Sequence, residues 1–208
     1  GSLSAENIKS AKFLSKNEIE NKFKFKFLKN NFVVTIHPER AYSRTIELTK
    51  NLLGELKKLK NTLIIFTSPN HDAHGGIIKN HIKKYIKTNK NGIFVESFGY
   101  QNYISCLKIS DGVIGNSSSG LTEAPNLKIG SINIGIRQKG RPLEKSVISA
   151  GIKKNQIGKA IKKLLTLKKN KKKYSKFNHY RPSYAKLKIL KILKSKKIKD
   201  IKTKIFFN

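Results

Sequence analysis

Three consecutive serines and a glycine, residues 117–120, follow a short apolar run in the segment GNSSSGLTEAPNL at residues 115–127. Serines in this position are typical of a strand that leads into a helix. The first backbone N–H groups of a helix have no partner within the helix, and together with the helix dipole they attract anions. We therefore expect Ser117, Ser118 and Ser119 to form an anion site suited to phosphate.

Glu123 follows this serine run and is expected on the first turn of the same helix. The chain holds only 12 acidic residues against 45 Lys and Arg, so a carboxylate here stands out. Its two oxygens could accept hydrogen bonds from two vicinal hydroxyls, such as those of a ribose. An ordinary helix start explains the pattern equally well, because serines cap helices and an acidic first turn complements the dipole.

Four more polar clusters follow apolar runs: HPER at 37–40, SPNHDAHGG at 68–76, SFGYQ at 97–101 and IRQKGR at 136–141. In open α/β sheets, ligands bind beyond the carboxyl ends of the strands. If the apolar runs are parallel strands, all five polar loops meet at one edge of the sheet. This coincidence predicts a binding cavity more strongly than any single motif does.

Individual residues in these loops have several possible roles. His37 could donate to a phosphate or transfer a proton, although a lone histidine is more often structural. The HDAH segment at 71–74 offers possible metal ligands, but no further Cys or His cluster completes a set, so no metal site is expected. Arg137 and Arg141 bracket the segment QKG and suit a diphosphate or a sugar, or they are simply solvated loop charges.

The apolar runs predict a doubly wound α/β fold with a parallel sheet. Strands are expected at 32–36, 62–67, 92–97, 112–116 and 131–135, and helices at 45–60, 76–87, 102–110, 120–127 and 155–167. Short apolar strands that alternate with helices are typical of a sheet covered on both faces. We expect a lead-in segment at 1–31, in which KFKFKF indicates a short amphipathic strand or an interface. A Rossmann-like domain is expected at 32–167, and a basic linker with a terminal helix at 168–208.

The formal net charge of +33 raises the possibility of nucleic-acid binding. However, only five of the basic residues are Arg (Arg40, Arg44, Arg137, Arg141, Arg181), and the other forty are Lys. Arg provides the two-point contacts that read bases and phosphates, whereas a Lys excess is typical of an AT-rich genome. We expect non-specific adhesion to nucleic acid at low salt and no specific recognition.

The remaining features favour a cytoplasmic protein. The single Cys106 cannot form an internal disulfide, suits a reducing cytosol and lies in an apolar segment where a buried thiol is expected. The first ten residues lack the apolar core of a signal peptide, and no apolar run is long enough to span a membrane.

The order of the motifs resembles the C-terminal half of the hydrolysing UDP-N-acetylglucosamine 2-epimerases. The resemblance rests on TIHPER, SPNHDAHGG, IGNSSSGLTEAP and INIGIRQKGR, and extends over about residues 1–195, including NHYRPSYAKLKILKIL. It implies one Rossmann-like half of a GT-B-like, two-domain enzyme of sialic-acid-type sugar synthesis. It also implies that UDP-N-acetylglucosamine is converted to N-acetylmannosamine and UDP without a cofactor.

The resemblance implies a role for each matching residue. Ser117, Ser118 and Ser119 would hold the UDP phosphates with Arg137, and Glu123 would hold the ribose hydroxyls. His37 would contribute to the active site. The remaining residues would contact the sugar nucleotide or its base: Asn70, Ser97, Phe98, Gly99 and Tyr103.

The chain departs from the family in lacking the N-terminal domain, which carries carboxylates for proton transfer. We therefore expect UDP binding but little turnover without that domain or a homo-oligomer partner. Two alternatives remain open: the donor-nucleotide domain of a GT-B glycosyltransferase, which the RQKGR loop disfavours, and a basic nucleic-acid-binding protein.

Overall fold

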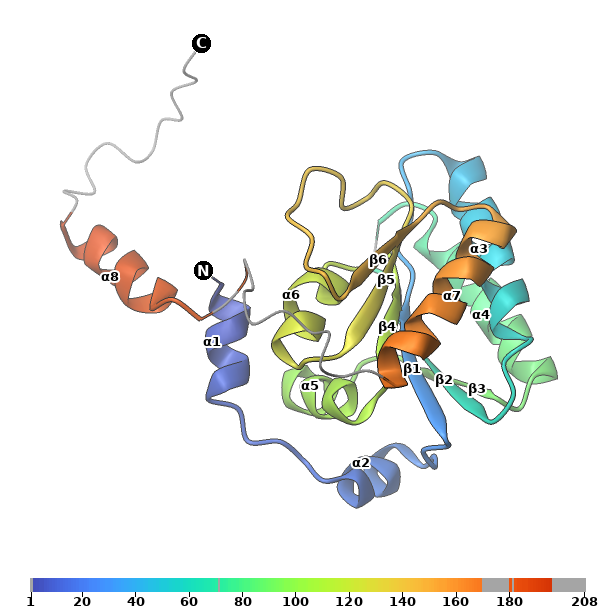
Figure 1. The fold of residues 1–208 in the computed structure, drawn as a ribbon, viewed down its shortest axis with the longest axis horizontal. Helices are drawn as coiled ribbons and strands as arrows, with labels where there is room; N and C mark the ends of the chain where they lie inside the picture. Colours follow the sequence, from blue (N-terminus) through green and yellow to red (C-terminus); the bar gives the residue numbers. More distant parts are fainter. Residues whose placement is uncertain (1, 71, 170–179, 181, 196–208) are drawn as a thin grey trace, which may run out of the picture.

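The computed structural model of the chain describes residues 2–70, 72–169, 180 and 182–195, and contains a six-stranded parallel sheet (Figure 1). Its strands are β1 (Asn30–Thr35), β2 (Thr62–Thr67), β3 (Gly92–Val95), β4 (Gly112–Gly115), β5 (Gly130–Ile134) and β6 (Val147–Ala150). They lie in the order β3-β2-β1-β4-β5-β6, and every neighbouring pair is parallel. This is the strand order of doubly wound nucleotide-binding domains, and it confirms the predicted fold class.

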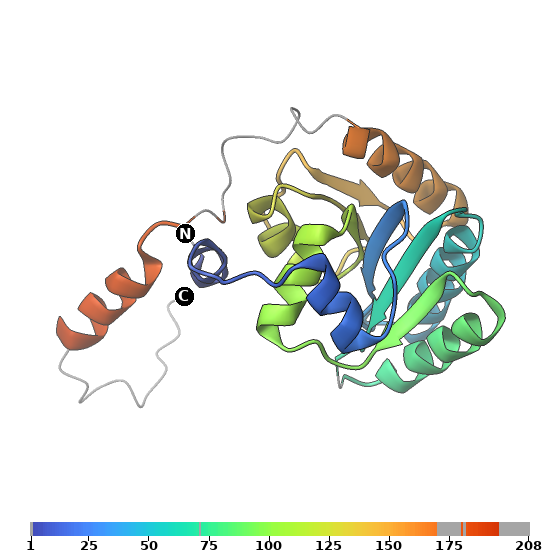
Figure 2. The same ribbon diagram turned by 90° about the horizontal axis from the view of Figure 1, so that it is seen from below.

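Helices cover both faces of the sheet (Figures 1 and 2). The helices α3 (Tyr42–Leu56), α4 (Gly75–Thr88) and α7 (Lys154–Lys169) pack on one face, and α2 (Lys16–Phe23), α5 (Tyr100–Ile109) and α6 (Ser119–Asn126) on the other. Two further helices, α1 (Leu3–Lys9) and α8 (Ala185–Ser195), lie beside this body, with α1 packed on α6.

The side chains of β1 explain why two layers of helices are needed. Phe32 and Val34 face the core beneath α3, α4 and α7, whereas Val33 between them faces the core beneath α2, α5 and α6. All three are fully buried. Because successive residues of a strand point to opposite faces, such a continuous apolar run must be covered on both sides.

The lead-in segment and the last strand differ from the sequence prediction. Residues 1–31 contain α1 and α2, and the KFKFKF stretch forms the end of α2 and a non-regular segment instead of a strand. Its alternation still has a structural reason, since Phe25 and Phe27 are buried against the sheet while Lys24 and Lys26 point outward. The strand β6 was not predicted.

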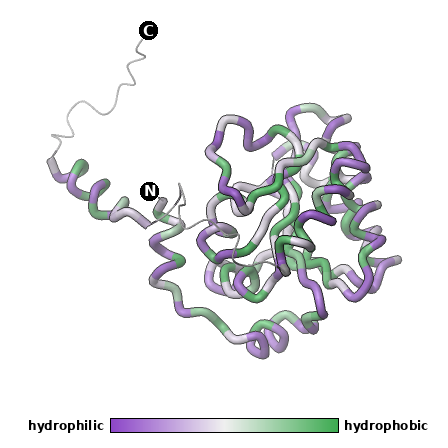
Figure 3. The backbone as a smooth tube through the Cα atoms, in the orientation of Figure 1, coloured by the Kyte–Doolittle hydropathy of each residue, from purple (hydrophilic) through white to green (hydrophobic). Residues whose placement is uncertain are grey.

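Of the predicted C-terminal part, the structure describes residues 168 and 169 at the end of α7, Tyr180 and residues 182–195, so most of the predicted linker lies outside the described residues. The predicted terminal helix is present as α8. Figure 3 shows hydrophobic and hydrophilic residues interspersed along this helix. Five large apolar side chains of α8 are exposed: Leu187, Ile189, Leu190, Ile192 and Leu193. No helix among the described residues is both long and apolar enough to cross a membrane.

The sheet order reverses between β1 and β4, and the carboxyl ends of these two strands frame the site. At the end of β4, Gly115 has a φ of 140° and lies so close to β1 that a Cβ atom would be 1.9 Å from the carbonyl oxygen of Thr35. Only glycine allows this approach. It brings the loop after β4 against the loop after β1.

Candidate nucleotide site

A cavity of about 360 Å³ opens between the carboxyl ends of β1, β2, β3 and β4. Seven of the eleven predicted site residues line it: His37, Ser97, Phe98, Gly99, Tyr103, Ser117 and Ser119. It lies where the strand order reverses, which is the usual ligand position in doubly wound sheets. The other four predicted residues, Asn70, Ser118, Glu123 and Arg137, are not part of its lining.

His37 is held by its backbone and by its ring. The side chain of Asn116 clamps the backbone, because its Oδ1 accepts from the His37 N–H at 2.7 Å and its Nδ2 donates to the His37 carbonyl at 2.9 Å. The backbone N–H of Asn70 donates to Nδ1 of the ring at 3.1 Å. Since Nδ1 is thereby an acceptor, the proton of the neutral imidazole lies on Nε2.

The surroundings of His37 keep its imidazole neutral. Burial first, and then the positive charge of Arg137, lower the pKa of His37 to about 4, against the opposing effects of the Asp72 carboxylate and the Asn70 side chain. At neutral pH the ring is therefore a hydrogen-bond donor through Nε2 and not a cation. A neutral donor can bind an oxygen of a ligand, or exchange a proton through the same nitrogen.

Aromatic side chains from α5 and from the loop before it form one wall of the cavity. Phe98 is buried, and the centroid of its ring lies 4.4 Å from the ring centroid of Phe23 and 6.4 Å from that of Tyr103. The hydroxyl of Tyr103 donates to Ser119 Oγ at 2.8 Å, and burial raises the pKa of Tyr103 to about 12. Flat apolar surfaces with a fixed hydroxyl are suited to the face of a nucleobase.

The serine junction is more self-contained than the sequence suggested. The N–H of Ser119 donates to Ser117 Oγ at 3.3 Å and the N–H of Gly120 donates to the Ser117 carbonyl at 3.3 Å, so these two amides do not point outward unpaired as predicted. The turn folds back because Ser117 and Ser118 act as its acceptors before the helix begins. Ser118, the N-cap residue of α6, makes no capping bond with its side chain.

Glu123 lies just beyond the first turn of α6, the turn on which it was expected. The helix begins at Ser119, so no acidic residue lies in its first turn, and Glu123 is its fifth residue. Its carboxylate accepts from Ser4 Oγ at 2.6 Å and from the hydroxyl of Thr122. Burial raises the pKa of Tyr100, and the negative charge of Glu123 raises it further. Tyr100 lines the cavity, so the Glu123 carboxylate lies near the cavity rim.

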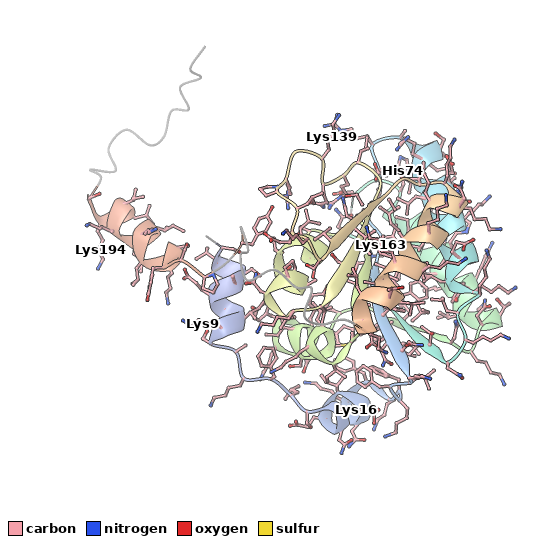
Figure 4. All side chains as sticks on the ribbon, in the orientation of Figure 1. Lys9, Lys16, His74, Lys139, Lys163 and Lys194 are labelled. Carbon is pink, nitrogen blue, oxygen red and sulfur yellow. The ribbon has the colours of Figure 1, made fainter. Side chains whose placement is uncertain are left out.

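A second, larger cavity of about 730 Å³ lies beside the first, between the loops after β1, β2 and β5. Arg137 lines this cavity together with Arg40 and Lys139, and its charge reaches His37. Figure 4 labels Lys139 and His74 at this edge of the molecule. The predicted Arg-rich loop therefore adjoins the smaller cavity and places cations beside it.

The sequence did not identify several residues that build the site. The hydroxyls of Thr35 and Thr67 hydrogen bond to each other at 2.6 Å on the floor of the smaller cavity. Gln138, within the RQKGR loop, donates through Nε2 to the carbonyl of Asn116 at 2.8 Å and so ties three loops together. The position of Asn116 directly after an apolar run was the available signal, because polar residues at strand ends face the ligand edge.

The HDAH metal hypothesis includes His71, which lies outside the described residues. Among the residues that the structure does describe, no three His, Cys, Asp or Glu side chains gather as potential metal ligands.

The fold and the cavity define a Rossmann-like nucleotide-binding domain of the kind found in GT-B-like enzymes. A family model described as UDP-N-acetylglucosamine 2-epimerase matches residues 1–194, and the chain belongs to this family. A GT-B glycosyltransferase domain would have the same architecture, so the fold alone does not distinguish the two families. The family match identifies the epimerase family.

Similar proteins agree with this membership. The chain is 37% identical over 166 residues to the GDP/UDP-N,N'-diacetylbacillosamine 2-epimerase (hydrolyzing) of Campylobacter jejuni, covering 79% of this chain and 43% of that protein. It is 40% identical over 163 residues to the polysialic acid biosynthesis protein P7 of Escherichia coli, covering 77% and 41%. The structure of S. aureus MnaA with UDP is similar in fold, with a TM-score of 0.67 and 14% identity over 92% of this chain and 52% of that one. The chain thus spans less than half the length of these two curated relatives.

Proposed function

We propose that this chain is the nucleotide-binding half of a hydrolysing UDP-N-acetylglucosamine 2-epimerase. The observation that carries the proposal is the convergence of His37, Phe98, Tyr103 and Ser117 on one cavity of a chain that belongs to this family. The base would stack against the aromatic wall, with the backbone of residues 97–99 at its edge. The diphosphate would lie between the serine junction and Arg137, and the ribose near Glu123.

In the proposed reaction, UDP leaves C1 of the sugar as a proton is removed from C2, which gives a glycal. Water then adds across the double bond, with the hydroxyl at C1 and a proton at C2 on the opposite face, so N-acetylmannosamine and UDP are the products. This chain would bind the leaving diphosphate and stabilise its charge through Arg137 and Lys139. His37, neutral and donating through Nε2, would hydrogen bond to the substrate.

Acid and base groups on both faces of the sugar are needed for this reaction. The chain spans 43% of its Campylobacter relative, and we propose that an N-terminal domain or a partner supplies the remaining groups. By itself the chain should bind UDP and release no measurable UDP from UDP-N-acetylglucosamine. We propose a cytoplasmic location, in line with its single free thiol.

Calorimetric titration with UDP at about 0.2 M salt tests the proposal, because non-specific phosphate adhesion is weak there. The wild-type chain should bind UDP, Glu123→Ala should bind at least tenfold more weakly, and Glu47→Ala, which removes an exposed carboxylate on α3, should bind as wild type. GDP in parallel identifies the base. Equal binding of UDP by all three proteins, or preferential binding of a single-stranded oligonucleotide, would contradict the proposal.

A further inference from the structure

The helix α1 contacts Glu123, a residue of the proposed nucleotide site, through Ser4. Its Oγ donates to Glu123 Oε1 at 2.6 Å, although the two residues are 119 positions apart in the sequence. The contact is anchored because Ala5 and Ile8, on the same helix, are buried and α1 packs along α6. The lead-in helix therefore supplies a hydrogen-bond donor to the site and is more than a connection to it.

The two oxygens of Glu123 have unequal donors. Oε2 accepts from the Thr122 hydroxyl, but that hydroxyl also lies 3.0 Å from the carbonyl oxygen of Ser118, and its single proton can serve only one acceptor fully. Ser4 Oγ has Glu123 as its acceptor and no competing one in the part of the chain that the structure describes. Ser4 is thus the donor that fixes the plane of the carboxylate.

A carboxylate held in this way remains able to bind a ligand. Each carboxylate oxygen has two acceptor positions, so one internal donor on each oxygen leaves one position on each for a ligand. Two adjacent acceptors in a fixed plane match the two hydroxyls of a vicinal diol. Fixing them before the ligand binds lowers the entropic cost of binding.

We propose that Ser4 is a positioning residue that orients the Glu123 carboxylate for the 2′- and 3′-hydroxyls of a ribonucleotide, and so sets the preference for ribose over deoxyribose. This inference rests on the proposed function, because it takes the ligand to be a nucleoside diphosphate. A free carboxylate would rotate, and would bind a single hydroxyl nearly as well as two. Loss of the Ser4 hydroxyl should therefore reduce the advantage of the second hydroxyl.

The test is calorimetric titration of the full chain with UDP and with 2′-deoxy-UDP. Ser4→Ala should weaken UDP binding about three- to tenfold, the range for one hydrogen bond to a charged group acting indirectly, and 2′-deoxy-UDP binding clearly less. The preference for ribose should fall at least threefold. Ser4→Thr keeps the hydroxyl and should therefore keep the wild-type preference for ribose. Ser10→Ala is the matched control, since Ser10 ends the same helix and donates only to backbone carbonyls of α1.

Two outcomes would overturn the inference while leaving the proposed function intact. In the first, Ser4→Ala has the wild-type affinity and ribose preference although Glu123→Ala loses UDP. In the second, both nucleotides weaken equally, which would indicate a general loosening of α1. A wild-type chain that does not bind UDP would instead refute the proposed function, and the inference with it. Misfolding is controlled by circular dichroism and by the thermal midpoint, which should fall only by the amount that the loss of one hydrogen bond to a carboxylate explains.

Discussion

The protonation of His37 gives the most direct test of the site's electrostatics. Its pKa of about 4 results from burial and from Arg137, with Asp72 acting in the opposite direction. NMR titration of the imidazole signals should give a midpoint near this value in the wild-type chain. Arg137→Gln should raise the pKa, because it removes a neighbouring cation, and Asp72→Asn should lower it further, because it removes a neighbouring anion.

The same shift predicts how folding stability depends on pH. The folded protein disfavours the charged imidazole, so stability is complete above the unfolded pKa of about 6.5 and falls as the pH drops toward 4. If the full pKa shift acts, the free energy of unfolding falls by about 2 kcal/mol between pH 6.5 and pH 5.0, at about 1.36 kcal/mol per pH unit. His37 is partly exposed, so solvent screening reduces this to about 1 kcal/mol.

Urea unfolding at pH 7.5 and pH 5.0 measures this loss, at pH values where most carboxylates are still ionised. In His37→Gln the pH-dependent loss should be smaller by about 1 kcal/mol than in the wild type. His81, whose pKa burial also lowers, contributes equally to both proteins and cancels in the comparison. A wild-type His37 midpoint near 6.5, or an Arg137→Gln variant with an unchanged or lowered pKa, would refute the reasoning.

Three further predictions concern the framework of the domain. Burial raises the pKa of Cys106 to about 12, so its alkylation at pH 8 should be at least a hundredfold slower in the folded chain than in urea. Leu52→Ala, at a fully buried position of α3, should lower the free energy of unfolding by about 2–5 kcal/mol, whereas Leu187→Ala on the exposed face of α8 should change it by less than about 0.5 kcal/mol. Glu6 accepts hydrogen bonds from the first backbone amides of α8; burial opposes the effect, but these hydrogen bonds lower the pKa of Glu6. Hydrogen exchange of those amides should accelerate in Glu6→Ala, and in the wild type only at a pH below the ordinary pKa of a glutamate, where the carboxylate is protonated.

The central strands were predictable because their apolar runs are continuous. A strand such as β2, TLIIFT, is buried on both faces and has no polar residue to interrupt the signal. The strand β6, VISA, has only four residues and one fully buried side chain, Ile148, so its sequence does not differ from that of a loop. Of the two alternatives predicted for the KFKFKF stretch, the strand is wrong, since its alternation came from packing of Phe25 and Phe27 without any strand pairing.

The sequence predicted which loops form the site, but it did not predict the contacts between residues of different loops. Polar residues at the ends of successive strands must share one edge of a parallel sheet, and His37, Phe98 and Ser117 do share a cavity. The pairing of Asn116 with the backbone of His37 depends on the close approach of two strands that are 79 positions apart in the chain. Periodicity carries no information about such contacts. The position of Glu123 within the helix differs for a local reason, because α6 begins at Ser119, one residue earlier than predicted, which makes Glu123 its fifth residue.

The charge of the chain and the lining of the cavity should contribute differently to binding. A net charge of +33 attracts any polyanion, but this attraction is screened beyond about 8 Å at physiological salt. The hydroxyl and aromatic groups of the cavity act at contact distance, where added salt has little effect. UDP also carries few charges and would release few counterions, so its affinity should fall much less between about 0.05 and 0.5 M salt than that of an oligonucleotide. In the proposed site, the Lys excess would then speed encounter with anions, while the choice among nucleotides would depend on Phe98, Tyr103 and Glu123.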